Sequence, residues 1–322
     1  MSSTPAIEID GLTRRFGDVL AVDGLSLTVH EGEVFGFLGP NGAGKSTTIH
    51  MLLGFLEPTA GSARLLGRSV TEDSRAIRER IGILPEGYGT YENLTGREHV
   101  VSAIETKGAD DDPDTILERV GLDPSASRRA VGGYSKGMAQ RLGLAVALVG
   151  DPALLILDEP TSGLDPTGVK RLRQIIDAEL DRGTTVFFSS HILDEVERVC
   201  DRVAILHDGS LQTVDSVEDL RATLSIESVI DVTLADRPTG VDLEAIDGVA
   251  ETQIDNTSVR VRCTKPTAKM QILRQLDDAA TVLDIDIENG SLETIFEAYT
   301  SASDGHALAA NGTTQPPTEV EK

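Results

Sequence analysis

The stretch GPNGAGKST, residues 39–47, most constrains what this chain can fold into. It follows the apolar segment EVFGFL, precedes a segment with helical spacing, and fits the pattern G-x-x-x-x-G-K-[ST] in the strand–turn–helix context that gives this pattern meaning. In such a turn the backbone N–H groups wrap a phosphate, the lysine adds a point charge, and the following hydroxyl binds Mg²⁺. We therefore expect a phosphate site, with Ser46 also a magnesium ligand, formed by Gly39, Asn41, Gly42, Ala43, Gly44, Lys45, Ser46 and Thr47.

Apolar strands alternate with helical segments over the first two thirds of the chain. We expect strands in 6–17, 25–39, 153–160 and 184–191, helices in 45–56, 74–82, 95–108, 114–121, 140–150, 167–183 and 192–200, and a hairpin at Asp208-Gly209. Thr95 and Glu98 have the spacing of a capping box at the start of one helix. Strands that are apolar throughout and alternate with helices indicate an α/β fold with a parallel sheet covered on both faces.

The texture of the sequence changes near residue 222. From there we expect a strand, a short helix, strands at 249–255 and 258–263, a helix at 268–280, a strand at 282–288 and a final helix. These elements predict a small α+β domain over residues 222–300, after a first domain over 1–221. The tail 301–322 has too little apolar content to stabilise a fold, so we expect it to be disordered.

Two carboxylates and a histidine follow the apolar strands that come late in the first domain. LLILDEP ends in Asp158 and Glu159, and His191 follows TTVFFSS. Asp158 is placed to hold Mg²⁺ through water, and Glu159, pointing the other way on the pleat, to polarise an attacking water. Because parallel strands end at one rim of the sheet, His191 could reach the same phosphate. The alternative is a solvated strand–turn junction with a structural histidine.

A second turn suited to phosphate lies at VGGYSKGMAQRLGLA, residues 131–145, just before a helix. The chain already has a better phosphate site upstream, so the ligand of this second turn is not obvious from the turn alone.

Charge and composition exclude several classes of protein. The formal net charge of −24 argues against a general nucleic-acid surface, and this acidity resembles that of proteins from salt-loving archaea. Cys200 and Cys263 have no metal-ligand spacing, and no apolar run of about 20 residues or signal sequence is visible. We therefore expect the chain to stay in the cytosol.

The motifs GPNGAGKST, YSKGMAQR, LLILDEP, SGLD and SSH occur in the order and spacing of ABC-type ATPases, which the chain resembles over residues 5 to 221. The resemblance implies a nucleotide-binding domain with a parallel core sheet, an antiparallel β subdomain and a helical subdomain, binding ATP and Mg²⁺. It also implies that Ser135 and Gly137 cap the ATP bound to Lys45 of a partner subunit in a head-to-tail dimer. Phe16 would stack on adenine, unless it is a core aromatic, Asp165 would signal across the dimer, and His191 would be the switch histidine.

Two positions depart from the most common pattern of that family. The signature turn is YSKGM where many members have L-S-G-G-Q, and the loop GILPEGYGTYENLT has Glu86 where a glutamine usually senses Mg²⁺ and the attacking water. With the ending SLETIFEAY, these variants resemble exporter-type (ABC-2) ATPases of drug, sodium and polysaccharide systems. A narrower, weaker resemblance is to the ATPase of the nitrous oxide reductase maturation transporter, often associated with copper.

The resemblance implies an ATPase subunit that powers solute transport with a separate membrane permease, forms a head-to-tail dimer, and is bound peripherally to the cytoplasmic face of the membrane. The segment around residues 86 to 100 would pass its motion to the permease. The alternative is a soluble ABC ATPase with a regulatory or nucleic-acid-linked role.

Overall fold

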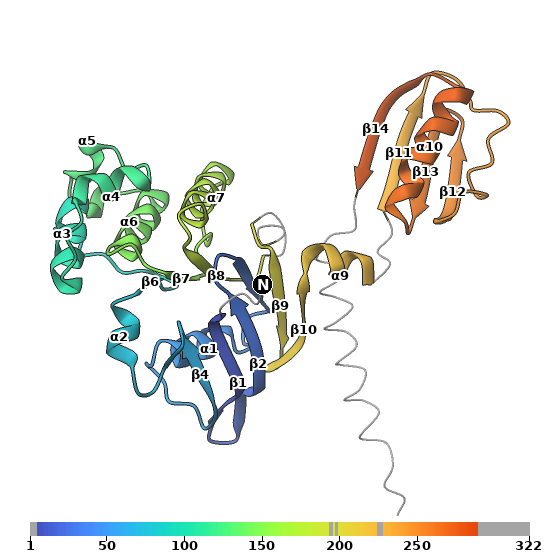
Figure 1. The fold of residues 1–322 in the computed structure, drawn as a ribbon. Coiled ribbons are helices and arrows are strands. Elements are labelled where there is room, and N and C mark those ends of the chain that lie inside the picture. Colours follow the sequence, from blue (N-terminus) through green and yellow to red (C-terminus); the bar gives the residue numbers. More distant parts are fainter. Residues whose placement is uncertain (1–4, 193–195, 197–198, 224–227, 289–322) are drawn as a thin grey trace, which may run out of the picture. The chain divides into compact units, whose positions relative to one another are not determined.

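The structure is a computed structural model of the 322-residue chain and describes residues 5–192, 196, 199–223 and 228–288. The chain separates into two compact units, Met1–Val217 and Glu218–Lys322 (Figure 1). Within the described ranges, no helix combines the length and the apolar character needed to cross a bilayer.

A six-stranded sheet with the order β10-β9-β3-β8-β7-β6 organises the first unit. Its strands are β3 (Val34–Leu38), β6 (Ile81–Leu84), β7 (Leu154–Asp158), β8 (Thr185–Ser190), β9 (Arg202–His207) and β10 (Ser210–Ser216). All neighbours are parallel except β9 and β10, a hairpin whose turn residues Asp208 and Gly209 both have positive φ. Every residue of β3, β7 and β8 is buried, as expected of strands covered on both faces.

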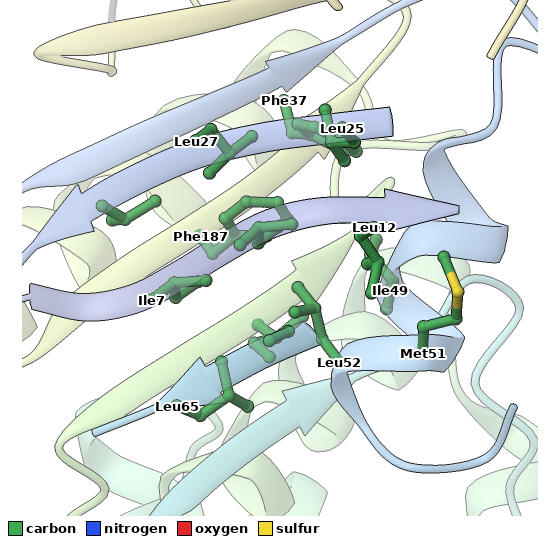
Figure 2. Packing of buried hydrophobic residues seen from close by; sticks show 14 of the residues in the cluster. Ile7, Leu12, Leu25, Leu27, Phe37, Ile49, Met51, Leu52, Leu65 and Phe187 are labelled. Atoms are coloured by element: carbon green, nitrogen blue, oxygen red, sulfur yellow. The ribbon is translucent and has the colours of Figure 1, made fainter. Parts of the chain in front are cut away.

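A second, antiparallel sheet has the order β2-β1-β4-β5. It consists of β1 (Pro5–Phe16), β2 (Val19–His30), β4 (Ala60–Leu65) and β5 (Arg68–Ser69). Its inner face and helix α1 (Lys45–Leu52) share one apolar core with the six-stranded sheet (Figure 2). Phe37 and Phe187 lie in this core with ring centroids 5.1 Å apart, and burying each stabilises the fold by about 1.5–3 kcal/mol.

Helices form the remaining part of the first unit. They are α2 (Ser74–Arg78), α3 (Gly96–Lys107), α4 (Pro113–Arg119), α5 (Pro124–Ser127), a 3₁₀ turn Val131–Gly133, α6 (Lys136–Leu148) and α7 (Pro166–Leu180). Helices α3, α4 and α6 pack on one another, forming the helical subdomain (Figure 1). The capping box is confirmed, because Thr95 Oγ1 accepts from Glu98 N and the Glu98 carboxylate accepts from Thr95 N.

The second unit contains a four-stranded antiparallel sheet with the order β12-β13-β11-β14. Its elements are α9 (Val217–Thr223, which begins at the last residue of the first unit), β11 (Ser228–Leu234), β12 (Val249–Asp255), β13 (Ser258–Cys263), α10 (Pro266–Ala279) and β14 (Val282–Glu288). Buried and exposed residues alternate along β13, and its buried residues join Ile272 and Leu276 of α10 in a separate core. The α+β character expected from the sequence is therefore present here.

Several local expectations were wrong. The helix expected over 74–82 ends at Arg78, and Ile81 begins β6, because apolar residues at the edge of the parallel sheet pair with β7. The short helix expected before residue 249 is absent, since residues 235–248 form turns and bends around Pro238 and Gly240. Helix α6 begins at Lys136 rather than near 140. Most of 192–200, the final helix and the tail lie outside the described residues.

Candidate functional site

The glycine-rich turn connects β3 to α1, and its backbone conformation requires glycine. Gly42 and Gly44 have φ of 87° and 101°, and a Cβ atom on Gly44 would lie 2.5 Å from the carbonyl oxygen of Ala21. Gly44 is the N-cap of α1 and offers no side chain to the first N–H groups of the helix. The amino end of α1 is therefore open to an external acceptor, the arrangement that binds phosphate.

Lys45 is buried at the start of α1. Its Nζ donates to the carbonyl oxygens of Gly39 (2.7 Å) and Pro40 (3.3 Å) and lies 3.5 Å from Oε1 of Glu159. The turn and the end of β7 thus hold one ammonium group from two sides.

Ser189, on β8, contacts both acidic residues at the end of β7, through the carboxylate of Asp158 and the backbone of Glu159. Its hydroxyl donates to Oδ1 of Asp158 (2.5 Å) and accepts from the backbone N–H of Glu159 (3.0 Å), which also lies 3.2 Å from the Ser189 carbonyl oxygen. Ser189 is not among the site residues predicted from the sequence. The available signal was a polar pair, Ser189-Ser190, at the end of an otherwise apolar strand.

The direction of Glu159 comes from a turn and not from the pleat, which corrects the sequence-based expectation. Strand β7 ends at Asp158, and Glu159 has φ of 48°, in the left-handed region that costs a non-glycine residue about 1–2 kcal/mol. This turn places the carboxylate between Lys45 and Nδ1 of His191, which lies 2.8 Å from Glu159 Oε2. The His191 side chain itself is 44% exposed.

A cavity of about 200 Å³ lies at this position and is lined by the turn residues, Ala21, Glu86 and Glu159. Burial raises the pKa of Asp158, and the carboxylates of Glu86 and Glu159 raise it further. Lys45 is the only basic residue among those that line this cavity in the described structure. The site combines hydroxyl and carboxylate oxygens with a deficit of positive charge, a donor set that suits a hard divalent cation.

Phe16 lies at the end of β1 and does not line this cavity. Its side chain is 46% exposed, so it is not a core aromatic, and the guanidinium carbon of Arg14 lies 4.5 Å from its ring centroid. A half-exposed aromatic ring supported by a cation offers a stacking surface.

Ser135, Gly137 and Asp165 meet at a second cavity, of about 600 Å³, between the starts of α6 and α7. Both polar side chains are helix N-caps: Ser135 Oγ accepts from Met138 N (3.3 Å), and Asp165 Oδ1 accepts from Gly168 N (2.7 Å). The two cavities share no lining residue. The predicted site residues thus form two groups within one chain. Lys45, Ser46, Glu86 and Glu159 line the first cavity, and Ser135, Gly137 and Asp165 line the second. Phe16 lines neither cavity.

Comparisons with known proteins show the family of the chain. A family model described as ABC transporter matches residues 22–162. The bacitracin transport ATP-binding protein BcrA of Bacillus licheniformis is 45% identical over 211 residues, covering 64% of this chain and 68% of that protein. The daunorubicin/doxorubicin resistance ATP-binding protein DrrA of Streptomyces peucetius is 35% identical over 99% of this chain and 98% of its own.

A solved structure described as the ATP-binding subunit of an ABC transporter has the same fold. It has a TM-score of 0.62 and 29% identity, and the match covers 69% of this chain and 93% of that one. The motifs, the fold and the full-length relative agree: the chain belongs to the family of ABC transporter ATP-binding proteins, the P-loop ATPases of that system.

Proposed function

We propose that this chain hydrolyses ATP to power the transport of a solute through a separate membrane permease. The observation that carries the proposal is the carboxylate of Glu159, held between Lys45 and His191 beside the glycine-rich turn. The names of the relatives, which concern bacitracin transport and drug resistance, support an exporter-type system. The proposal also places the chain on the cytoplasmic face of the membrane, bound to that permease.

The residues in and around the first cavity have separate roles. The N–H groups of the turn and the ammonium of Lys45 bind the β- and γ-phosphates. Glu159 accepts a proton from the attacking water, and His191 orients that carboxylate and contacts the γ-phosphate. Phe16, with Arg14 behind it, stacks on the adenine.

The residues present fit Mg²⁺. Ser46 and Glu86 line the first cavity, and burial, together with the carboxylates of Glu86 and Glu159, raises the pKa of Asp158, so a divalent cation there would stabilise its charged form. When bound by Ser46, Asp158 and Glu86, the metal would neutralise charge on the phosphates.

Two copies of the chain complete each site. Because Ser135 and Gly137 line a different cavity from Lys45, one chain does not bring both groups to one phosphate. In a head-to-tail dimer the second turn of one copy covers the phosphate held by the other, with Asp165 beside the junction. Loss of the γ-phosphate removes this link and reopens the dimer, and residues 86 to 100 pass the motion to the permease.

The substrate is set by the permease. The narrower likeness to the ATPase of the nitrous oxide reductase maturation transporter stays a prediction.

The acidic composition supports assays at high salt, where the repulsion among the protein's negative charges is screened.

The test is Glu159→Gln, which keeps the size and the hydrogen bonds of the side chain but removes the base. We expect ATP binding to persist and the rate of hydrolysis to fall at least about a hundredfold. Glu105→Gln, on the exposed face of α3, is the matched control and should hydrolyse ATP normally. Near-normal hydrolysis by Glu159→Gln protein would overturn the assignment.

Transport coupling needs its own measurement. A tagged copy of the chain, purified from its own membranes, should bring down a protein with several membrane spans. Recovery of the chain alone, from the soluble fraction, would favour an ABC ATPase that is not coupled to transport.

A further inference from the structure

The two departures from the common family pattern carry opposite charges. Glu86 adds a carboxylate to the first cavity, and Lys136 adds an ammonium beside the second. Neither change is needed by the fold, because Glu86 is exposed in the loop after β6 and Lys136 is exposed at the first position of α6. A ligand that contacts both cavities would account for both changes.

The second cavity is lined by three basic side chains, Lys136, Arg141 and Arg171. In the part of the chain that the structure describes, none of them forms an ion pair. Arg141 donates to the carbonyl oxygens of Gly137 and Gly121, and Arg171 to the amide of Gln174. In a protein with 53 acidic and 29 basic residues, three such groups around one cavity make a local positive field that no internal carboxylate neutralises.

Asp165 lowers this positive charge but does not cancel it. It is the only acidic residue among those that line the second cavity in the described structure, and its Oδ1 already accepts from Gly168 N as the cap of α7. The face that carries Ser135 therefore offers more positive than negative charge.

The Lys136 side chain lies at the rim of this cavity. Its Nζ, Cε and Cδ occupy the space that a side chain at Gly163 would need, so the Lys136 side chain crosses the SGLD loop, residues 162–165. Within the described residues the Lys136 ammonium makes no hydrogen bond. It is free to bind an external anion close to the cap of α6.

The first cavity has the opposite balance. Its lining includes Glu86 and Glu159 against the single Lys45, and that lysine already lies 3.5 Å from Glu159. A bound triphosphate adds further negative charge at this position. A second cation beside the phosphate would offset the carboxylate that Glu86 introduces.

Building on the proposed head-to-tail dimer, we propose that Lys136 is a phosphate-binding residue acting in trans: its ammonium contacts the terminal phosphate held by Lys45 of the partner copy and offsets the charge of Glu86 there. Arg141 and Arg171 add to the field without contact. The chain then recognises a triphosphate through one cation from each copy, in addition to the hydroxyl of Ser135.

The experiment measures the ATP concentration that gives half-maximal dimer, by light scattering, in Glu159→Gln protein. Adding Lys136→Gln should raise this concentration about tenfold, whereas Lys136→Arg, which keeps the charge, should leave it near the starting value. Lys170→Gln is the matched control, because Lys170 is an exposed lysine of α7 that does not line the cavity.

The coupling to Glu86 is tested by a double-mutant cycle. In Glu159→Gln protein that also carries Glu86→Gln, the effect of Lys136→Gln should fall to about threefold, because the charge that Lys136 offsets is gone. An equal effect in both backgrounds would overturn the link to Glu86. No effect of Lys136→Gln, in protein whose ATP-dependent dimer is abolished by Ser135→Arg, would overturn the role of Lys136 and leave the proposed function intact.

Two further outcomes separate the hypotheses. If Glu159→Gln protein binds ATP in equilibrium dialysis but its mass does not respond to ATP, the trans arrangement and this inference fail together. If Glu159→Gln protein binds no ATP, the proposed function itself fails.

Discussion

The starts of α1 and α6 differ in how their exposed N–H groups are satisfied. At α1 the N-cap is Gly44, in a left-handed conformation and without a side-chain acceptor. At α6 the N-cap is Ser135, whose hydroxyl accepts from Met138 N. The first helix start has no side-chain cap and has the buried Lys45 beside it, whereas at the second start one N–H group is already satisfied within its own chain.

This difference indicates two modes of phosphate binding. The open start can hold a phosphate alone, because its donors have no competing partner. The capped start has one N–H group already satisfied and offers the spare proton of the Ser135 hydroxyl, the backbone of Gly137 and the adjacent Lys136, so it suits a contact that is made and broken. We expect tight binding at α1 and a weaker, reversible contribution from α6.

The largest expected effect is at the open start. Lys45→Met removes the basic side chain that lines the first cavity and should weaken ATP binding about a hundredfold in equilibrium dialysis. Lys170→Met, on exposed α7 surface, is the control for loss of a charge. ATP affinity within threefold of the unmodified protein would show that the N–H groups of α1 account for binding and would contradict a major contribution from the Lys45 ammonium.

The capped start allows stability and phosphate recognition to be separated. Aspartate caps a helix as well as serine, but it brings a negative charge to face the phosphate. Ser135→Asp should keep the Tm within about 1 °C and raise the ATP concentration needed for dimerisation at least about tenfold.

Ser135→Ala should instead lose the cap, at a cost of about 1 kcal/mol. Its Tm should fall by about 2–4 °C in calorimetry. A stable Ser135→Asp protein that dimerises normally with ATP would contradict the idea that this turn faces a phosphate.

The smallest expected effect concerns the excess of carboxylates over cations at the first cavity. The pKa of Asp158 is raised in the folded chain, so the unfolded chain releases that proton first and stability falls as pH rises from the unfolded toward the folded value. Asp158→Asn removes this penalty and keeps the acceptor for Ser189. Without ATP or Mg²⁺ it should raise the Tm by about 2 °C at neutral pH, with a gain that shrinks as the pH approaches about 4.

Asp208→Asn, at an exposed carboxylate in the β9–β10 turn, is the matched control and should leave the Tm unchanged at every pH. With ATP and Mg²⁺ the order should reverse, because the unmodified protein gains a bound cation that Asp158→Asn protein holds less well. A lower Tm for the variant without ligands would contradict the charge balance described for this cavity.

The sequence predicted the elements whose signals are local. The capping box at Thr95, the glycine-rich turn and the alternating β13 depend on neighbouring residues, and the structure contains all of them. The sequence predicts a helix over residues 74–82, but Ile81 and Gly82 belong to the short strand β6, because its pairing with β7, distant in sequence, decides its conformation.

The site was predictable in composition but not in geometry. Asp158 and Glu159 could be named from their place after an apolar strand, yet the left-handed turn at Glu159 and the contacts of Ser189 depend on the packing of β8 against β7. The separation of the two cavities also could not be derived from the spacing of motifs, because it depends on where α6 and α7 begin in space.

The position of Ser189 has a consequence for how this site can change over time. One hydroxyl is shared between a carboxylate proposed to hold a metal and the backbone of the residue proposed to act as base. A substitution there would disturb ion affinity and turnover together, so these two properties cannot drift independently in descendants of this chain. Variation in the proposed transport rate would have to arise elsewhere, for example at the second turn, which lines a different cavity.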